Sequence, residues 1–220
     1  PTSGYPTYYN CADIAQFVID YPDCTRLPST LRLPYSGGDL TNYPGLEQID
    51  SISINLVCDE CNITTLQGLE NLTYVGGNVT IDEPHDPIEN LQGLNNLSHI
   101  GGSLRLWECV DMTSTNGLDN LLYIGNKVDL FENRQLVEIV GFENISTLPG
   151  GLVVEENEAL PNLTGFESLT HVGGDVQIID NISLTSIQGL DNLETIGETI
   201  DIDGNTVLTN LDDLSSLNSV

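Results

Sequence analysis

The stretch GNKVDLFENRQLVEIVGFENISTL, residues 125–148, sets a pattern that the rest of the chain repeats. Before it, 101–124 has the same length, 76–100 is one residue longer, 50–75 is two residues longer, and 28–49 fits a degenerate first copy. Repeats of about 20–50 residues are typical of solenoids, whose units bury their apolar faces only against each other. We therefore expect about eight stacked coils. The three stretches that follow are PGGLVVEENEALPNLTGFESLTHV (149–172), GGDVQIIDNISLTSIQGLDNLETI (173–196) and GETIDIDGNTVLTNLDDLSSLNSV (197–220).

Each block follows the consensus G-G-x-V-x-I-x-x-N-x-x-L-x-x-I-x-G-L-x-N-L-x-x-I. The V-x-I pair has the period of two that predicts a short strand with its aliphatic side chains inward. Apolar residues then recur at every third position, which matches neither an α-helix nor a strand and indicates corners or 3₁₀-like segments. The G-G pair predicts a corner with positive φ. The expected strand pairs are Ile52/Ile54, Val79/Ile81, Leu104/Leu106, Val128/Leu130, Leu152/Val154, Val176/Ile178 and Ile200/Ile202.

An asparagine follows the strand pair at intervals of 24 residues in the later blocks. Stacked in register, these amides predict an internal ladder in which each one satisfies backbone groups of neighbouring turns. Pro84 and Cys109 occupy the same position in earlier blocks, so we expect the ladder to be incomplete there and Cys109 to be a small buried apolar residue. The ladder residues are Asn133, Asn157, Asn181 and Asn205.

The chain carries 33 acidic and only five basic residues, a formal net charge of −28. Binding to nucleic acid or to an anionic membrane surface requires Lys and Arg to neutralise phosphate, so the composition argues against both partners. No stretch approaches the roughly 18 apolar residues of a membrane span, so direct membrane insertion is not expected. The patterned aliphatic residues argue against disorder, which acidic chains otherwise favour.

Catalytic chemistry finds little support in the sequence. A glycan-cleaving β-helix needs carboxylates paired with a base or cation in a groove, but Asp129 and Asp201 lie on strands with two coils between them. The three histidines have no Ser or Cys partner evident in the sequence, and no phosphate-binding loop is present. We therefore expect a non-enzymatic protein with no catalytic residues and no cofactor. The acidic runs 155–158 and 201–205 predict weak, diffuse Ca²⁺ association and no defined metal site, since they depart from the EF-hand pattern.

The blocks resemble the receptor L domain, the leucine-rich-repeat-like β-helix of growth-factor receptor ectodomains and fungal cell-wall proteins. The likeness rests on the runs GLENLTYVGGNVTI (68–81) and GLNNLSHIGGSLRL (93–106), and it extends over about residues 11–220. It implies an all-β fold, a right-handed β-solenoid with a helical cap at the N-terminus. The repeats give this solenoid about eight coils, more than a single receptor L domain typically has. The matching positions are architectural, so the resemblance assigns no catalytic residue.

The N-terminal segment, residues 1–27, is similar to the cap of that family, and 28–220 forms the solenoid domain. Ile14, Phe17 and Val18 have the spacing of one helix face, and Tyr21-Pro22 ends the helix. The resemblance implies a disulfide that pins the helix over the open end of the core. Its two cysteines flank the helix and are Cys11 and Cys24.

Cys58 and Cys61 form a C-x-x-C motif in the longest coil. Thioredoxin-like chemistry would need a βαβ setting and zinc would need a second ligand pair, so we favour a local disulfide. Two such bridges would indicate an oxidising, extracellular compartment.

Seven N-x-S/T sequons are present, more than composition alone predicts, which indicates a secreted N-glycosylated protein. Three of them share one outward-facing repeat position, Asn71, Asn96 and Asn144, and two more lie on the next corner, Asn62 and Asn162. Asn78 and Asn181 are the weaker candidates, because Asn181 falls in the internal ladder. The alternative is that the repeat consensus itself generates these motifs and that they stay unmodified.

The outward residues of the strands form columns across the coils, and one region of them is apolar. Trp107 beside Phe131 stands where other coils place Asp or Glu, which predicts a surface that binds a protein or a glycan. The alternative is that another part of the protein covers these rings. The residues expected to form this ligand-binding face are Arg105, Trp107, Phe131, Val153 and Ile179.

No cap-like segment follows the last block, so we expect the C-terminal end of the core to be uncapped and open to self-association. Two functions follow. The first is an extracellular recognition or adhesion module at a cell surface. The alternative is a structural subunit of a cell wall, matrix or filament, assembled end to end. The residues expected at the stacking end are Leu208, Leu211, Leu214, Leu217 and Val220.

Overall fold

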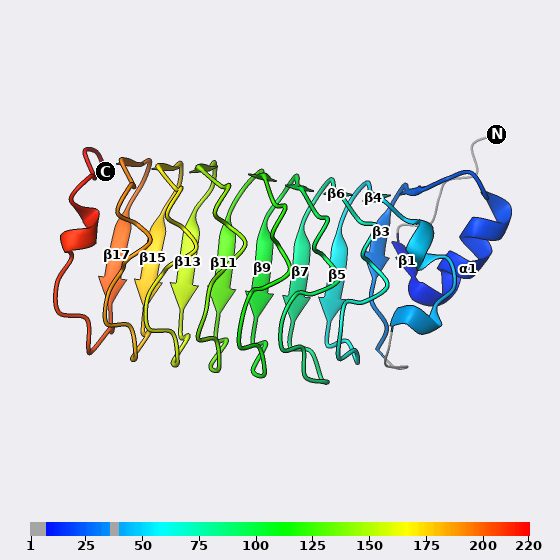
Figure 1. The fold of residues 1–220 in the computed structure, drawn as a ribbon, viewed down its shortest axis with the longest axis horizontal. Coiled ribbons are helices and arrows are strands. Elements are labelled where there is room, and N and C mark those ends of the chain that lie inside the picture. The colour runs from blue at the N-terminus through cyan, green and yellow to red at the C-terminus, as the bar shows by residue number, and fades with distance from the viewer. Residues whose placement is uncertain (1–7, 36–39) are drawn as a thin grey trace.

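The computed structural model describes residues 8–35 and 40–220, which form an all-β, right-handed solenoid with its coils stacked along the long axis (Figure 1). The largest sheet has nine strands in the order β1-β3-β5-β7-β9-β11-β13-β15-β17, and neighbouring strands pair in parallel. Their bounds are β1 Tyr8–Asn10, β3 Thr30–Arg32, β5 Leu56–Asp59, β7 Val79–Asp82, β9 Leu104–Trp107, β11 Val128–Phe131, β13 Leu152–Glu155, β15 Val176–Ile179 and β17 Ile200–Asp203.

Two-residue strands line a second side of the rod, along its upper edge in Figure 1. They form a five-stranded sheet, β10-β8-β6-β4-β2, and a three-stranded sheet, β12-β14-β16. The bounds are β2 Arg26–Leu27, β4 Ser51–Ile52, β6 Tyr74–Val75, β8 His99–Ile100, β10 Tyr123–Ile124, β12 Thr147–Leu148, β14 His171–Val172 and β16 Thr195–Ile196. Turns form the third side, with short 3₁₀ helices at η1 Leu40–Asn42, η2 Leu46–Gln48 and η3 Asp212–Leu214.

The break between the two short-strand sheets has a local cause. In other coils the N–H that follows the short strand bonds to the preceding coil, as from Gly125 to the Ile100 carbonyl and from Gly173 to the Leu148 carbonyl. Pro149 occupies this position after β12 and has no N–H to donate. The pairing between β10 and β12 is therefore interrupted.

The coil count is about seven, against the eight expected. The seven four-residue strands from β5 to β17 mark complete coils, whereas the stretch 28–49 contributes the three-residue β3 and the turns η1 and η2. The predicted strand pair Ile52/Ile54 is wrong. Ile52 belongs to β4 and Ile54 is exposed, because the two extra residues of this block displace the long strand to β5. Its inward residues are Leu56 and Cys58.

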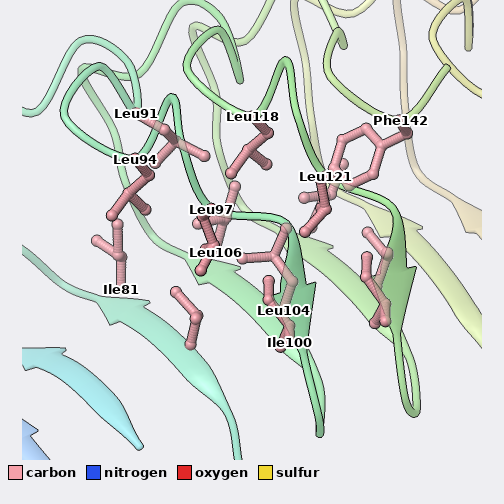
Figure 2. Packing of buried hydrophobic residues seen from close by; sticks show 14 of the residues in the cluster. Ile81, Leu91, Leu94, Leu97, Ile100, Leu104, Leu106, Leu118, Leu121 and Phe142 are labelled. Atoms are coloured by element: carbon pink, nitrogen blue, oxygen red, sulfur yellow. The ribbon is translucent and has the colours of Figure 1, made fainter. Parts of the chain in front are cut away.

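The core is one continuous aliphatic column. Figure 2 shows Leu91, Leu94 and Leu97 from the turn side pointing into the coil toward residues of the strands such as Leu104 and Leu106, and all five are fully buried. The period of three in the sequence is therefore confirmed as one inward residue per step of the turn side. Since burial of a Leu or Ile side chain contributes roughly 1.5–3 kcal/mol, stacking is what stabilises coils that have few internal backbone bonds.

The G-G pairs do not have positive φ, contrary to expectation. That conformation belongs to the glycine of the G-L dipeptide, as at Gly93 (φ 112°). The G-G pair is needed for close approach instead, because a Cβ on Gly101 would lie 2.2 Å from the Gly76 carbonyl oxygen and one on Gly76 would lie 2.3 Å from that of Ser53. Glycine here lets successive coils stack at the corner.

The internal asparagine ladder is confirmed. Asn133, Asn157 and Asn181 are fully buried, and each Oδ1 accepts the backbone N–H of the equivalent residue one coil earlier. The Nδ2 group of Asn157 donates to the carbonyls of Leu130 and Glu155, both at 3.0 Å. Every polar atom of the amide thus has a partner inside the core.

Cys109 is buried at the ladder position, as expected, with its Sγ 3.4 Å from the Trp107 carbonyl oxygen. Burial raises the pKa of this thiol far above its usual range. Pro84 stands at the equivalent position one coil earlier and lacks the N–H that an asparagine Oδ1 would accept. The ladder therefore stops at Asn133 for want of a donor.

The capping helix α1 (Cys11–Asp20) lies at the N-terminal end of the rod (Figure 1). Ile14 and Phe17 are buried, as expected from their spacing, and the ring of Phe17 packs edge-on against that of Tyr9 at 5.4 Å. Both β1 and β2 pair with strands of the solenoid, so the cap and the coils interlock across the expected boundary at residue 27. No helix in the described part of the chain is long and apolar enough to cross a membrane.

The Cys58–Cys61 disulfide is confirmed, with Cα atoms 5.2 Å apart. The Cys11–Cys24 bridge is not formed, because Cys24 is an exposed free thiol; the side chain of Cys11 lies outside the described residues. The backbone explains the difference. The Cys24 N–H bonds to the Tyr21 carbonyl, which holds Cys24 at the C-terminal end of α1, whereas Cys11 begins this helix of about 15 Å. Disulfide Cα atoms lie about 4.4–6.8 Å apart.

Candidate recognition surface

The outer face of the nine-stranded sheet brings together three of the five residues expected to bind a ligand. Trp107 at the end of β9 lies directly opposite Phe131 at the end of β11, with ring centroids 5.5 Å apart and the planes at 61°. The guanidinium carbon of Arg105 lies 4.2 Å from the centroid of the Trp107 ring, a cation–π contact. These three side chains form one packed patch at the middle of the rod.

The other two residues lie apart from that patch. Val153 is opposite Asp129 and only 9% exposed, and Ile179 is opposite Glu155, which separates it from Phe131. Trp107 and Phe131 were expected to be exposed. Both are half-buried, because the side chains of the patch cover each other. The indole Nε1 of Trp107 is buried and has no hydrogen-bond acceptor within residues 8–35 and 40–220.

Two half-buried cations pair with a buried carboxylate beneath the patch, and sequence reasoning missed this arrangement. Asp129 is only 2% exposed although it is on the outer face, and its Oδ2 lies 2.6 Å from Nζ of Lys127 and 3.7 Å from Nε of Arg105. Two of the five basic residues of the chain thus converge on one carboxylate. The sequence does contain a signal for this arrangement: adjacent blocks place two cations beside an Asp in a chain otherwise poor in cations. Because a buried charge is costly without its partner, the pair fixes Arg105 against Trp107.

Carboxylates surround the patch and repel each other. Burial, followed by the negative charges of Asp59 and Glu83, raises the pKa of Asp82, which is opposite Trp107. Burial, followed by the charge of Glu156, raises the pKa of Glu155, which is opposite Phe131. The apolar patch therefore has an acidic rim that its own cations do not neutralise.

A column of acids borders the sheet where each long strand ends. Six consecutive coils place an acidic residue there in the left-handed conformation, with φ between 42° and 56°. Glycine adopts this conformation most easily and takes the position at Gly204 in the next coil. Burial, followed by the charges of Glu83 and Glu132, raises the pKa of Glu108 in this column. The residues are Glu60, Glu83, Glu108, Glu132, Glu156 and Asp180.

The acids do not assemble a metal centre. Within the described residues no group of three or more His, Cys, Asp or Glu side chains is placed to hold a metal ion. A cavity of about 380 Å³ is lined by Glu156, Glu158, Asp180 and Ile182, and Arg134 pairs with Glu158 at 3.7 Å and with Glu132.

The expected glycosylation residues differ in their surroundings. Asn71, Asn78, Asn96 and Asn144 are exposed, while Asn62 and Asn162 are half-buried. The side-chain amide of Asn62 donates to the Tyr35 carbonyl, and Oδ1 of Asn162 accepts from the N–H and hydroxyl of Thr164. Asn181 is fully buried in the ladder, as expected.

The shared corner position has a structural role that sequence reasoning missed. Nδ2 of Asn71 donates to the Glu47 carbonyl of the preceding coil at 2.7 Å, and Nδ2 of Asn96 donates to the Glu70 carbonyl at 2.7 Å. The residue before the asparagine accepts from the N–H of the positive-φ glycine, as Glu70 does from Gly68. The recurring G-L-E-N motif is therefore a corner clasp, which accounts for part of the sequon count.

The last coil is the least buried part of the core. Leu208, Leu214 and Leu217 are half-buried and pack against the core cluster, whereas Leu211 and Val220 are 49% and 60% exposed. The five residues expected at a stacking end thus share one coil, but they do not form one uniformly exposed face. Burial is also lower in β17, whose inward residues Ile200 and Ile202 are only half-buried.

Comparison of the chain with protein-family models, with curated proteins and with solved structures found no match.

Proposed function

We propose that the chain is a non-enzymatic, secreted and N-glycosylated recognition module that binds a protein partner through the outer face of its nine-stranded sheet. The observation that carries the proposal is the patch of Arg105, Trp107 and Phe131, which replaces acids at the middle of this face and is held by the ion pair of Lys127 with the buried Asp129 carboxylate. Aromatic and arginine side chains are the residue types that dominate binding energy at interfaces.

The rim indicates the charge of the partner. Asp82 and Glu155 flank the aromatic pair, and like-charge neighbours contribute to their raised pKa values. A partner that places Lys or Arg around an apolar anchor would relieve this repulsion, and its association would weaken as salt rises. The Cys58–Cys61 disulfide, the sequons and the resemblance to receptor L domains support an extracellular location.

A cell-surface binding assay tests the proposal. Fluorescent tetramers of the chain are applied to cells, and binding is measured by flow cytometry at 50 and 300 mM NaCl. We expect the pair Trp107→Ala and Phe131→Ala to reduce binding at least tenfold and high salt to reduce wild-type binding. The matched control is Val137→Ala, because Val137 is also an exposed apolar residue but lies outside the sheet. Equal binding of the double variant and the control would refute the sheet face as the site.

A further inference from the structure

A band on the short-strand side carries no charge in five consecutive coils. The stretches 71–77, 96–102, 120–126, 144–150 and 168–174 contain no Asp, Glu, Lys or Arg. With 17% charged residues in the chain, this many residues would carry about six charges on average. We call these stretches the neutral band. A chain with a charge of −28 that leaves one side uncharged presents there a surface suited to an uncharged ligand.

The neutral band contains stacked rings that end at an open face. Tyr74, His99 and Tyr123 stack in three successive coils with centroids 4.7 and 4.5 Å apart and planes within 14°. Each interface between these rings covers two ring faces. In the next coil the equivalent position is Thr147, a much smaller side chain, and the pairing of its strand with β10 is interrupted. No further ring continues the stack there, and Tyr123 is 45% exposed.

Leu122 departs from the repeat beside that ring. At the equivalent position Thr73, Ser98 and Thr170 have a hydroxyl that donates to a carbonyl of the preceding coil, as Ser98 does to that of Thr73. Leu122 cannot make this bond, is 63% exposed, and removes the sequon that Asn120 would otherwise have. An exposed leucine and an open tyrosine face therefore adjoin on one coil without an internal structural reason.

Asn144 is the sequon residue nearest to this pair by register. It stands one coil after Asn120 in the corner column, about 4.8 Å along the rod. Unlike Asn71, Asn96 and Asn120, its side chain makes no hydrogen bond within the described part of the chain. The bonded asparagines point their Nδ2 toward the preceding coil, and for Asn144 the preceding coil is the one that carries Leu122.

We propose that Leu122 and Tyr123 bind the first sugar residues of an N-linked glycan on Asn144, which rests on the glycosylation in the proposed function. The C–H face of an N-acetylhexosamine packs on the open face of Tyr123, and Leu122 supports the ring from the side. The neutral band places no carboxylate against the uncharged sugar, which satisfies charge complementarity. The glycan covers the one apolar pair that the corner leaves exposed.

A thermal-stability cycle on the secreted protein tests the proposal. Glycopeptide mass spectrometry first measures the occupancy of Asn144. The melting temperature is then compared for wild type, Asn144→Gln, Tyr123→Ala and the double variant, so that the loss of the His99 stacking cancels in the cycle. We expect Tyr123→Ala to lower the melting temperature by about 2–4 °C more when the Asn144 glycan is present than when it is absent.

Two further variants sharpen the cycle. Leu122→Ala should show coupling of the same sign, and alanine is chosen because serine or threonine would create a sequon at Asn120. Val137→Ala is the matched control; this exposed valine lies on the turn side, and its effect should be independent of the Asn144 glycan.

The outcomes separate the two proposals. Additive effects with Asn144 occupied would overturn the contact and leave the glycosylation standing. An unmodified Asn144 in the secreted protein would overturn both the glycosylation of Asn144 and the glycan contact. If the wild-type protein with Asn144 occupied instead sediments as a dimer that Leu122→Asp dissociates, the neutral band binds a second copy of the chain, and the glycan contact is overturned.

Discussion

Two columns that differ by one residue in the sequence run side by side along the rod with opposite energetics. Asn133, Asn157 and Asn181 stack inside the coil, and the residue before each of them, Glu132, Glu156 or Asp180, belongs to the acidic column outside. The amide both donates and accepts, so each asparagine binds the next coil and the previous one. An ionised carboxylate only accepts, so identical neighbours repel.

The difference shows what a repeat can gain from placing the same residue at the same position in every coil. A column stabilises the stack when its side chain is complementary to its own copy, and destabilises it when the copy repeats the charge. The acidic column also requires the left-handed conformation, which favours glycine. Its stability must therefore come from the buried column beside it.

The buried column should give the largest effect when it is broken. Asn157→Ala removes the acceptor for the Asn133 N–H and the donor to the Leu130 and Glu155 carbonyls, all inside the core. We expect a loss of about 3 kcal/mol in the free energy of unfolding, measured by urea denaturation. Asn205→Ala is the control, because Asn205 is half-buried and should cost clearly less. Equal losses would contradict the dependence on burial.

The ladder could be predicted from the sequence because its period and its chemistry agree. The long strands from β7 to β17 were predicted for the same reason, but near residue 54 two inserted residues shift the strand and an alternating pattern fits two registers. The two-residue strands of the second side were not predicted, because the period of three indicated corners or 3₁₀-like segments there. The role of the G-G corner was missed because it depends on the distance between coils, which a single repeat does not contain.

The candidate site was harder to predict than the fold. The pair Trp107 and Phe131 follows from the register, but the burial of Asp129 depends on two long cationic side chains folding over it. The prediction of a Cys11–Cys24 bridge was wrong because of the path that the backbone takes after α1, which the spacing of the cysteines does not reveal.

Extending the ladder by one step should require two changes. Cys109→Asn places an amide next to the Ile81 and Trp107 carbonyls, but its Oδ1 would face Pro84, which has no N–H. We expect this variant to lose about 1–2 kcal/mol from an unsatisfied buried acceptor.

Adding Pro84→Ala should restore the donor and recover at least half of that loss in a double-variant cycle of chemical denaturation. Strict additivity of Cys109→Asn and Pro84→Ala would show that the missing N–H is not what ends the ladder.

Neutralising the carboxylates around the patch should have a smaller, pH-dependent effect, and it should stabilise the protein. The pKa values of Asp82, Glu108 and Glu155 are raised in the folded state, so the native protein binds more protons than the unfolded chain around and above pH 4–5. Stability from these groups therefore rises as the pH falls from 7 toward 5. We expect the variant Asp82→Asn, Glu108→Gln, Glu155→Gln to be more stable at pH 7 by the order of 1 kcal/mol after solvent screening.

A matched control uses carboxylates of the corner clasp. Glu70, Glu143 and Glu167 accept from the N–H groups of positive-φ glycines, so changing all three to Gln removes charge-assisted bonds together with the charge. The pH dependence of thermal unfolding should flatten in the sheet-face variant, and the corner variant should not share its gain in stability at pH 7. If both variants gain equally, the total charge of the chain is responsible and the sheet-face cluster is not.

The corner asparagines should give the smallest effect, and they separate hydrogen bonding from burial. Asn120 is exposed and donates to the Asn95 carbonyl at 2.7 Å, whereas Asn144 at the equivalent position makes no such bond among the described residues. In unglycosylated protein we expect Asn120→Ala to cost about 0.5 kcal/mol and Asn144→Ala to be neutral in chemical denaturation. A cost at Asn144 as large as that at Asn120 would mean that the corner amide acts through backbone conformation. In that case asparagine would stabilise the exposed corner without a hydrogen-bond partner. Burial alone would then not distinguish the internal ladder from the corner asparagines.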